Sequence, residues 1–286
     1  MGIRARSEFC GGALATLKFR KSGVSTHTLR GRAPSGDVSN TRLIHVTTVG
    51  AARAILAAGQ IETRFCKVFK KNLLYTFAFR PAYKVSESRE KRSILDYFPF
   101  VFVIDGNSLP APYHVYPFDT GGAFQGAFDE AASEWVYIDD YELTPDLSGV
   151  GSHIDWAFGS RRAYFEGEVR DTLIESVPNW DTGPITFAQI ARLAQEGSNK
   201  PDKRASAIEV AFNHHVSLKA HVMFAVIPRQ FLEDERGDNT TVIAALKANG
   251  IQWQTFEWQP NSAPEEFHRE IEMLVRERFE AEGVLK

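Results

Sequence analysis

Four polar residues lie in otherwise apolar stretches typical of buried strands: His45 and Thr47 in RLIHVTT, Arg80 at the end of LLYTFAFR, and Glu209 in SAIEVAF. A charged side chain in such a setting is costly unless it is paired or functional. A carboxylate can stabilise a developing positive charge or accept a proton, and a guanidinium can bind phosphate. An imidazole and a hydroxyl add hydrogen-bond donors and acceptors. These polar residues in apolar strands mark the predicted site.

Each of these residues also has an ordinary structural explanation. Glu209 could be an ion-paired residue at a strand end, and Arg80 could be a strand-end arginine at the surface. His45 could be a hydrogen-bonded histidine of the core. The residues alone leave these alternatives open.

The local sequence predicts the strand that carries His45 and Thr47 and the helix that follows it. A strand over residues 42–47 places His45 and Thr47 on the same face, because strand side chains alternate. The alanine-rich residues 51–58 predict a helix that ends at Gly59.

The other two polar positions belong to later predicted strands. Residues 73–79 are continuously apolar or aromatic, which indicates a strand covered on both faces, and Pro81 ends its pairing. Residues 205–212 predict a strand with Glu209 in its middle, and residues 264–280 predict a closing amphipathic helix.

Residues 108–200 carry weaker patterns. The predicted elements there are an ordered aromatic loop at 113–122, a helix at 124–132, a strand or loop at 135–143, and a helix at 186–195 that is capped by Thr186.

The order of these segments resembles the ADP-ribosyltransferase fold, and most closely its DarT-like branch. The resemblance rests on His-x-Thr followed by a helix ending in Gly, on Phe-x-Arg-Pro closing a strand, on VFVIDGN at 101–107, and on KRASAIEV at 203–210. It covers roughly residues 42–107 and 202–232. It implies an α+β fold with a split β-sheet core, peripheral helices and a large insertion at about 108–200.

The resemblance also implies an activity, NAD-dependent mono-ADP-ribosyl transfer to a nucleobase of DNA or RNA, with single-stranded DNA as the expected partner. Glu209 and Arg80 would be catalytic, His45 and Thr47 would hold NAD, and Tyr75 and Phe79 would contact it. A toxin or phage-defence role with a neutralising antitoxin protein is typical of the branch. Ala207 stands where arginine-modifying relatives have Gln or Glu, so protein arginine is a poor candidate acceptor. Pro81 follows Arg80 without the intervening serine of the family, so the turn at this position departs from the family's pattern.

Two alternatives to this activity stay open. Water could replace the nucleobase as acceptor, which would make the protein an NAD glycohydrolase. The fold could also serve as a non-catalytic module that binds nucleic acid or protein.

Contacts to an acceptor are expected from a basic connector and from one turn. Lys67, Lys70 and Lys71 cluster beside Arg64, where a DNA-modifying relative would place its substrate strand. A solvated charged face explains them equally well. Asp119 is a candidate substrate contact, although a turn explains it too.

Composition limits the kinds of protein that this chain can be. The chain has 286 residues, 43% hydrophobic content and a net charge of −3, which excludes a uniformly basic surface but not a local basic groove. Two cysteines without metal spacing predict a reduced, cytoplasmic protein that uses no metal. No stretch is apolar enough to predict a membrane span. Residues 1–40 form a basic arm with seven Lys or Arg and two Asp or Glu, ahead of a single domain at 41–286.

Overall fold

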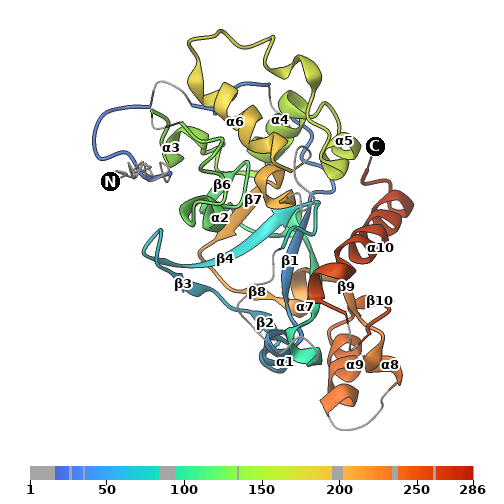
Figure 1. The fold of residues 1–286 in the computed structure, drawn as a ribbon. Coiled ribbons are helices and arrows are strands. Elements are labelled where there is room, and N and C mark those ends of the chain that lie inside the picture. The colour runs from blue at the N-terminus through green and yellow to red at the C-terminus, as the bar shows by residue number, and fades with distance from the viewer. Residues whose placement is uncertain are drawn as a thin grey trace, which may run out of the picture.

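The computed structural model describes residues 17–25, 28–34, 36–83, 94–133, 135–194, 202–233, 238–259 and 262–285. These residues form a mixed α+β fold, as expected. It is built around one large sheet, with helices gathered at the two ends of the sheet and along one side (Figure 1). Cys10 and the first part of the predicted basic arm lie outside the described residues.

The large sheet has the strand order β10-β9-β5-β1-β4-β7-β6, and β3 pairs with β4 beside this path. Every pairing is antiparallel except that of β10 with β9, and β2 pairs separately with β8. The strands are β1 (Arg42–Thr48), β2 (Gln60–Ile61), β3 (Arg64–Cys66), β4 (Lys71–Ala78), β5 (Pro99–Asp105), β6 (His114–Tyr116), β7 (Glu209–Phe212), β8 (Val216–Ser217), β9 (Val222–Pro228) and β10 (Gln252–Phe256).

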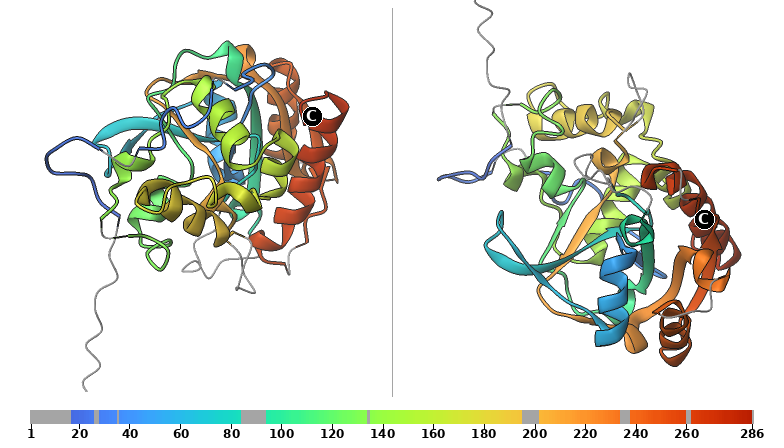
Figure 2. Two further views of the ribbon diagram at one scale, coloured as in Figure 1. Left: turned by 90° about the horizontal axis from the view of Figure 1, so that it is seen from above. Right: turned by 60° about the horizontal axis from the view of Figure 1, so that its bottom comes forward.

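The helices cover this sheet from several sides. Helices α3 to α6 lie together at the top of Figure 1, while α1, α8 and α9 lie at the opposite end, and α10 runs along the side near β9 (Figures 1 and 2). The helices are α1 (Val49–Ala58), α2 (Thr120–Phe124), α3 (Ile138–Tyr141), α4 (Leu147–Ala157), α5 (Arg161–Glu166), α6 (Thr182–Arg192), α7 (Leu218–His221), α8 (Gln230–Glu233), α9 (Asp238–Ala248) and α10 (His268–Ala281). Short 3₁₀ turns are η1 (Leu95–Tyr97), η2 (Gly106–Ser108), η3 (Asp171–Leu173), η4 (Lys203–Ser206) and η5 (Pro264–Phe267).

Strands β1 and β4 are joined over only part of their length. They are in register at Leu43 with Ala78 and at Ile44 with Phe77, whereas β1 pairs with β5 along all seven of its residues. Beyond Ile44 the two strands therefore no longer share a ladder, and the sheet opens between them.

Helix α1 ends at Gly59 as predicted but begins at Val49, two residues before the predicted start. The Thr48 side chain caps it by accepting from the amide of Ala51, and Gly59 ends it with a left-handed φ of 68°. The predicted strand at 73–79 is β4, but Phe79 lies outside it with a φ of 54°.

Several predictions for the later segments were wrong in detail. The predicted strand at 205–212 begins only at Glu209, because residues 203–206 form a 3₁₀ turn capped by Asp202. The predicted closing helix starts as η5 and continues as α10, with its apolar residues Ile271, Val275 and Phe279 buried.

The segment at 108–200 contributes to the sheet itself. The predicted aromatic loop contains β6, which forms the sheet edge beside β7. The predicted helix at 124–132 is wrong, because Gly126 takes a left-handed φ of 79° and the chain continues as turns.

Two more predictions in this segment were wrong. The predicted strand or loop at 135–143 contains α3, whose Asp140 carboxylate accepts from the Tyr137 amide and so stabilises the first turn. The helix predicted at 186–195 is α6, and Thr186 lies inside it with its hydroxyl bonded to the Thr182 carbonyl instead of capping it.

The described part of the basic arm packs against the segment around α3 and α6. Leu17 and Leu29 are buried, and the basic residues meet acidic partners. The ion pairs are Arg20 with Asp140, Arg30 with Glu142, and Arg32 with Asp181. Three of the five basic residues in the described part of the arm are therefore paired with acidic residues of the later chain. Within the described part of the chain, no helix has the length and apolar character needed to cross a membrane.

His153 in α4 should make stability depend on pH. Its ring is buried against Phe187, with 4.7 Å between ring centroids, and burial lowers its pKa to about 3. Between about pH 6.5 and 3 the unfolded chain binds a proton that the folded chain does not. The free energy of unfolding should therefore be fully maintained above pH 6.5 and fall by about 1 kcal/mol per pH unit below it. Urea unfolding at several pH values checks this, and an identical pH dependence in His153→Phe would contradict it.

Candidate active site

A cavity of about 360 Å³ lies where β1 and β4 separate. Helix α1 and strands β2 and β3 complete its walls. The polar lining includes three predicted NAD-binding residues, His45, Thr47 and Tyr75, together with Glu62, Arg64 and Cys66. A pocket of this size is within the range of about 300–1,000 Å³ that is usual for small-molecule sites.

His45 bridges the opening between the two strands. Its Nδ1 lies 2.9 Å from the carbonyl oxygen of Tyr75, which can only accept, so Nδ1 carries the hydrogen. Burial lowers the pKa of His45, and the backbone bond to Tyr75 opposes this only in part. The neutral ring thus presents Nε2 as an acceptor. His45 is both a hydrogen-bonded residue of the fold and a lining residue of the cavity.

Tyr75 on β4 lines the cavity, and its ring also lies beside His114 on β6. Its hydroxyl donates to Cys66 Sγ at 2.9 Å, and burial raises the pKa of the phenol above its ordinary value. The Tyr75 ring lies 6.0 Å from the ring of His114 on β6.

Glu209 is fully buried and hydrogen-bonded within the fold. His114 Nε2 lies 3.2 Å from Oε1, the Thr120 hydroxyl donates to Oε1 at 2.7 Å, and the Thr120 amide donates to Oε2 at 3.1 Å. Burial raises the pKa of Glu209 above its ordinary value, and the bonds from His114 and Thr120 oppose this only in part. This arrangement agrees with the expectation that a carboxylate in an apolar strand must be paired.

Glu209 lies near the cavity but is separated from it by the side chains of Tyr75 and His114. Tyr75 lines the cavity, His114 lies beside Tyr75, and Glu209 is bonded to His114. Phe69, in the connection between β3 and β4, covers the same imidazole with 4.3 Å between ring centroids. Glu209 does not line the cavity among the described residues, and one layer of rings lies between them.

Arg80 is bound to a different part of the fold. Its Nη1 donates to the carbonyl oxygen of Ser206 at 3.1 Å and to its hydroxyl at 2.9 Å, and its guanidinium lies 5.5 Å from the ring of Tyr164. Burial lowers the pKa of Arg80. Phe79 is buried under Arg161, 5.0 Å from its ring centroid. Within the described chain, the structure brings neither Arg80 nor Phe79 to the cavity.

Of the residues predicted to contact an acceptor, the three lysines are exposed and Asp119 is paired within the fold. Lys67 and Lys70 are exposed on the connection between β3 and β4. Lys71, the exposed first residue of β4, places its Nζ 4.5 Å from the centroid of the Tyr113 ring. Asp119 instead forms an ion pair with Arg204 at 2.8 Å.

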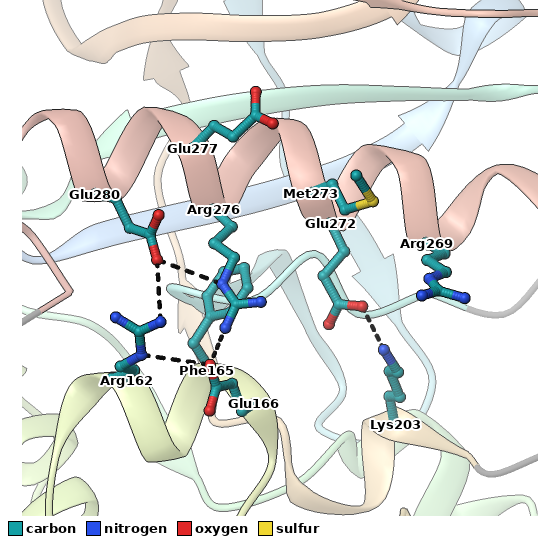
Figure 3. Close-up of a pocket in the computed structure, with 10 residues that line it drawn as sticks. All are labelled: Arg162, Phe165, Glu166, Lys203, Arg269, Glu272, Met273, Arg276, Glu277 and Glu280. Carbon is teal, nitrogen blue, oxygen red and sulfur yellow. Dashed lines mark hydrogen bonds and ion pairs between the residues drawn. The ribbon is translucent and has the colours of Figure 1, made fainter.

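A second and larger cavity of about 600 Å³ lies between α5, η4 and α10 (Figure 3). It is lined by four basic and four acidic residues, and most of them form ion pairs, either within one helix or across the cavity. The pairs are Arg162 with Glu166 and Glu280, Arg276 with Glu166 and Glu280, and Lys203 with Glu272. These contacts join the helices and leave little net charge for a ligand.

The sequence interpretation missed His114 and Thr120. The signal was the short alternation His-Val-Tyr between Pro112 and Pro117, since prolines often flank edge strands. Among the described residues, no group of three or more His, Cys, Asp or Glu is arranged to hold a metal ion.

No protein-family model, curated protein or solved structure matches this chain.

Proposed function

We propose that this protein is an NAD-dependent mono-ADP-ribosyltransferase that modifies a nucleobase of DNA or RNA. The observation that carries the proposal is the placement of His45, Tyr75 and Glu209 on the adjacent strands β1, β4 and β7, beside the opening in the sheet. Two of the three line one cavity, and the third is linked to it through His114.

NAD would bind in the cavity through groups that the lining supplies. His45 Nε2 can accept from a ribose hydroxyl, and the Thr47 hydroxyl can donate or accept. Arg64 adds a positive charge beside them, which suits the pyrophosphate.

Breaking the bond between nicotinamide and ribose develops positive charge on the ribose. A buried carboxylate such as Glu209 stabilises that charge strongly, because the surroundings exclude water. The proposal requires the ring layer formed by Tyr75 and Phe69 to move when the ligands bind.

A nucleic acid acceptor is supported by the connection between β3 and β4. Three exposed lysines lie on it and at the start of β4, next to the cavity wall that β3 provides, on a chain whose net charge is −3. Local positive charge of this kind suits a phosphate backbone. A toxin or phage-defence role with a neutralising protein partner belongs to the same proposal.

The test is a measurement of nicotinamide release and of mass change on oligonucleotides. Purified protein is incubated with NAD alone, with single-stranded DNA and with RNA. Release that rises with an oligonucleotide, together with a mass gain of one ADP-ribose on it, supports transfer. Equal NAD loss without an oligonucleotide indicates hydrolysis, and no loss with any acceptor contradicts both enzymatic functions.

His45→Ala tests the assignment of the cavity. Loss of one hydrogen bond made equally in the bound and transition states should raise KM for NAD about tenfold and leave kcat unchanged. Steady-state kinetics measure both constants, with the exposed Arg229→Gln as a matched control. An unchanged KM would show that NAD binds elsewhere.

A further inference from the structure

His114 lies between Glu209 and the cavity wall, and one of its two ring nitrogens is buried without a hydrogen-bond partner among the described residues. Its Nε2 is bonded to Glu209, whereas Nδ1 is buried and has no hydrogen-bond partner in the described part of the protein. The residue is only 2% exposed. Buried polar atoms nearly always have a partner, so this atom needs an explanation.

The neighbours of Glu209 determine which ring nitrogen of His114 carries the hydrogen. The Thr120 amide and hydroxyl both donate to the carboxylate, and a third donor completes a set that suits the ionised form. Nε2 must then be protonated to make its bond. In the neutral ring the lone pair lies on Nδ1, which is therefore a buried base held by a carboxylate.

Aromatic rings cover this base. Phe69 is closest at 4.3 Å, followed by Tyr116 at 5.0 Å, Tyr113 at 5.4 Å and Tyr75 at 6.0 Å between ring centroids. Phe69 is half-buried and belongs to the lysine-bearing connection between β3 and β4. Movement of this connection would uncover His114 on the side where an acceptor strand is proposed to bind.

We propose that His114 is the general base of the transfer reaction, and that Glu209 orients it and stabilises its protonated form. This inference rests on the proposed function. The bond between the ribose carbon and nicotinamide breaks, and nicotinamide leaves with the electron pair. A lone pair of the acceptor nitrogen forms the new bond to that carbon, and the acceptor's N–H proton moves to Nδ1. NAD and the acceptor supply every atom and electron, and the imidazolium then returns its proton to solvent.

His114→Gln separates this role from simple positioning. The glutamine amide can place an N–H near the position of Nε2 and keep the bond to Glu209, but it offers no base. Loss of a general base should lower kcat for transfer about 10²-fold or more and leave KM for NAD unchanged. His221→Gln, a histidine bonded to Ser108, serves as the control and should behave like wild type. Circular dichroism verifies that each variant folds.

The outcomes distinguish the inference from the function on which it rests. A His114→Gln enzyme with wild-type kcat overturns the inference alone. A wild-type protein that consumes no NAD overturns the proposed function and the inference with it. Nitrogen-15 spectra of histidine-labelled wild-type protein give a result independent of folding in the variant. We expect the Nε2–H form of His114, and an Nδ1–H form would overturn the assignment of the base.

Discussion

Glu209→Gln should reduce nicotinamide release about 10³-fold with saturating NAD and an oligonucleotide acceptor, because the variant lacks the charge that stabilises the ribosyl cation. The fold should survive the change. The glutamine oxygen can still accept from the Thr120 amide, and its amino group can donate to the Thr120 hydroxyl. It can also donate to His114 Nε2 once the ring hydrogen has moved to Nδ1. We therefore expect the free energy of unfolding to change by no more than about 2 kcal/mol.

The control for this variant is Glu257→Gln, which removes an exposed carboxylate paired with Arg229. It should keep wild-type turnover and stability, since exposed ion pairs contribute about 0–1 kcal/mol. Wild-type turnover in Glu209→Gln would leave Glu209 as a structural residue. Another group would then perform the chemistry.

Arg80→Ala should lower the free energy of unfolding by about 3 kcal/mol. Removing this buried side chain leaves a cavity against Tyr164 and deprives the Ser206 carbonyl and hydroxyl of their donor. The damage lies where β4 and β7 meet, because the Tyr164 hydroxyl donates to the Ala78 carbonyl and accepts from the Ile208 amide. Urea unfolding measures the loss.

The same variant tests the catalytic role that the resemblance implies for Arg80. Its contacts in the structure are with the scaffold, so kcat of the folded variant should fall less than about tenfold. Arg162→Ala is the matched control, since Arg162 is 57% exposed and its ion pairs are long. A kcat loss of 10²-fold or more in fully folded Arg80→Ala would show that the guanidinium acts on the substrate.

Much of the framework could be predicted from local sequence. The helix after β1 is bounded by Thr48 and Gly59, whose effects are local, since a side-chain cap and a left-handed residue act within one turn. The pairing of Glu209 was expected as one alternative, because a buried carboxylate without a partner is too costly. The identity of that partner was not predicted.

Other features depended on contacts between residues far apart in the chain. Asp139 and Asp140 carry no local sign that Arg20, about 120 positions earlier, binds them. Thr186 has the residue type of a helix cap, yet its hydroxyl is used inside α6 and against Tyr141. Tertiary packing determines these partners and positions, and it overrides the weak conformational preference of a single residue.

The sequence by itself determined which residues could do chemistry, because an imidazole, a hydroxyl and a carboxylate embedded in apolar strands need partners or a ligand. Only the tertiary structure decided which of them meet. It opens the sheet between β1 and β4, brings His45, Thr47 and Tyr75 to one cavity, encloses Glu209 behind His114, and directs Arg80 to Ser206. Strand order and register set these distances, and both depend on pairings between segments more than 30 residues apart.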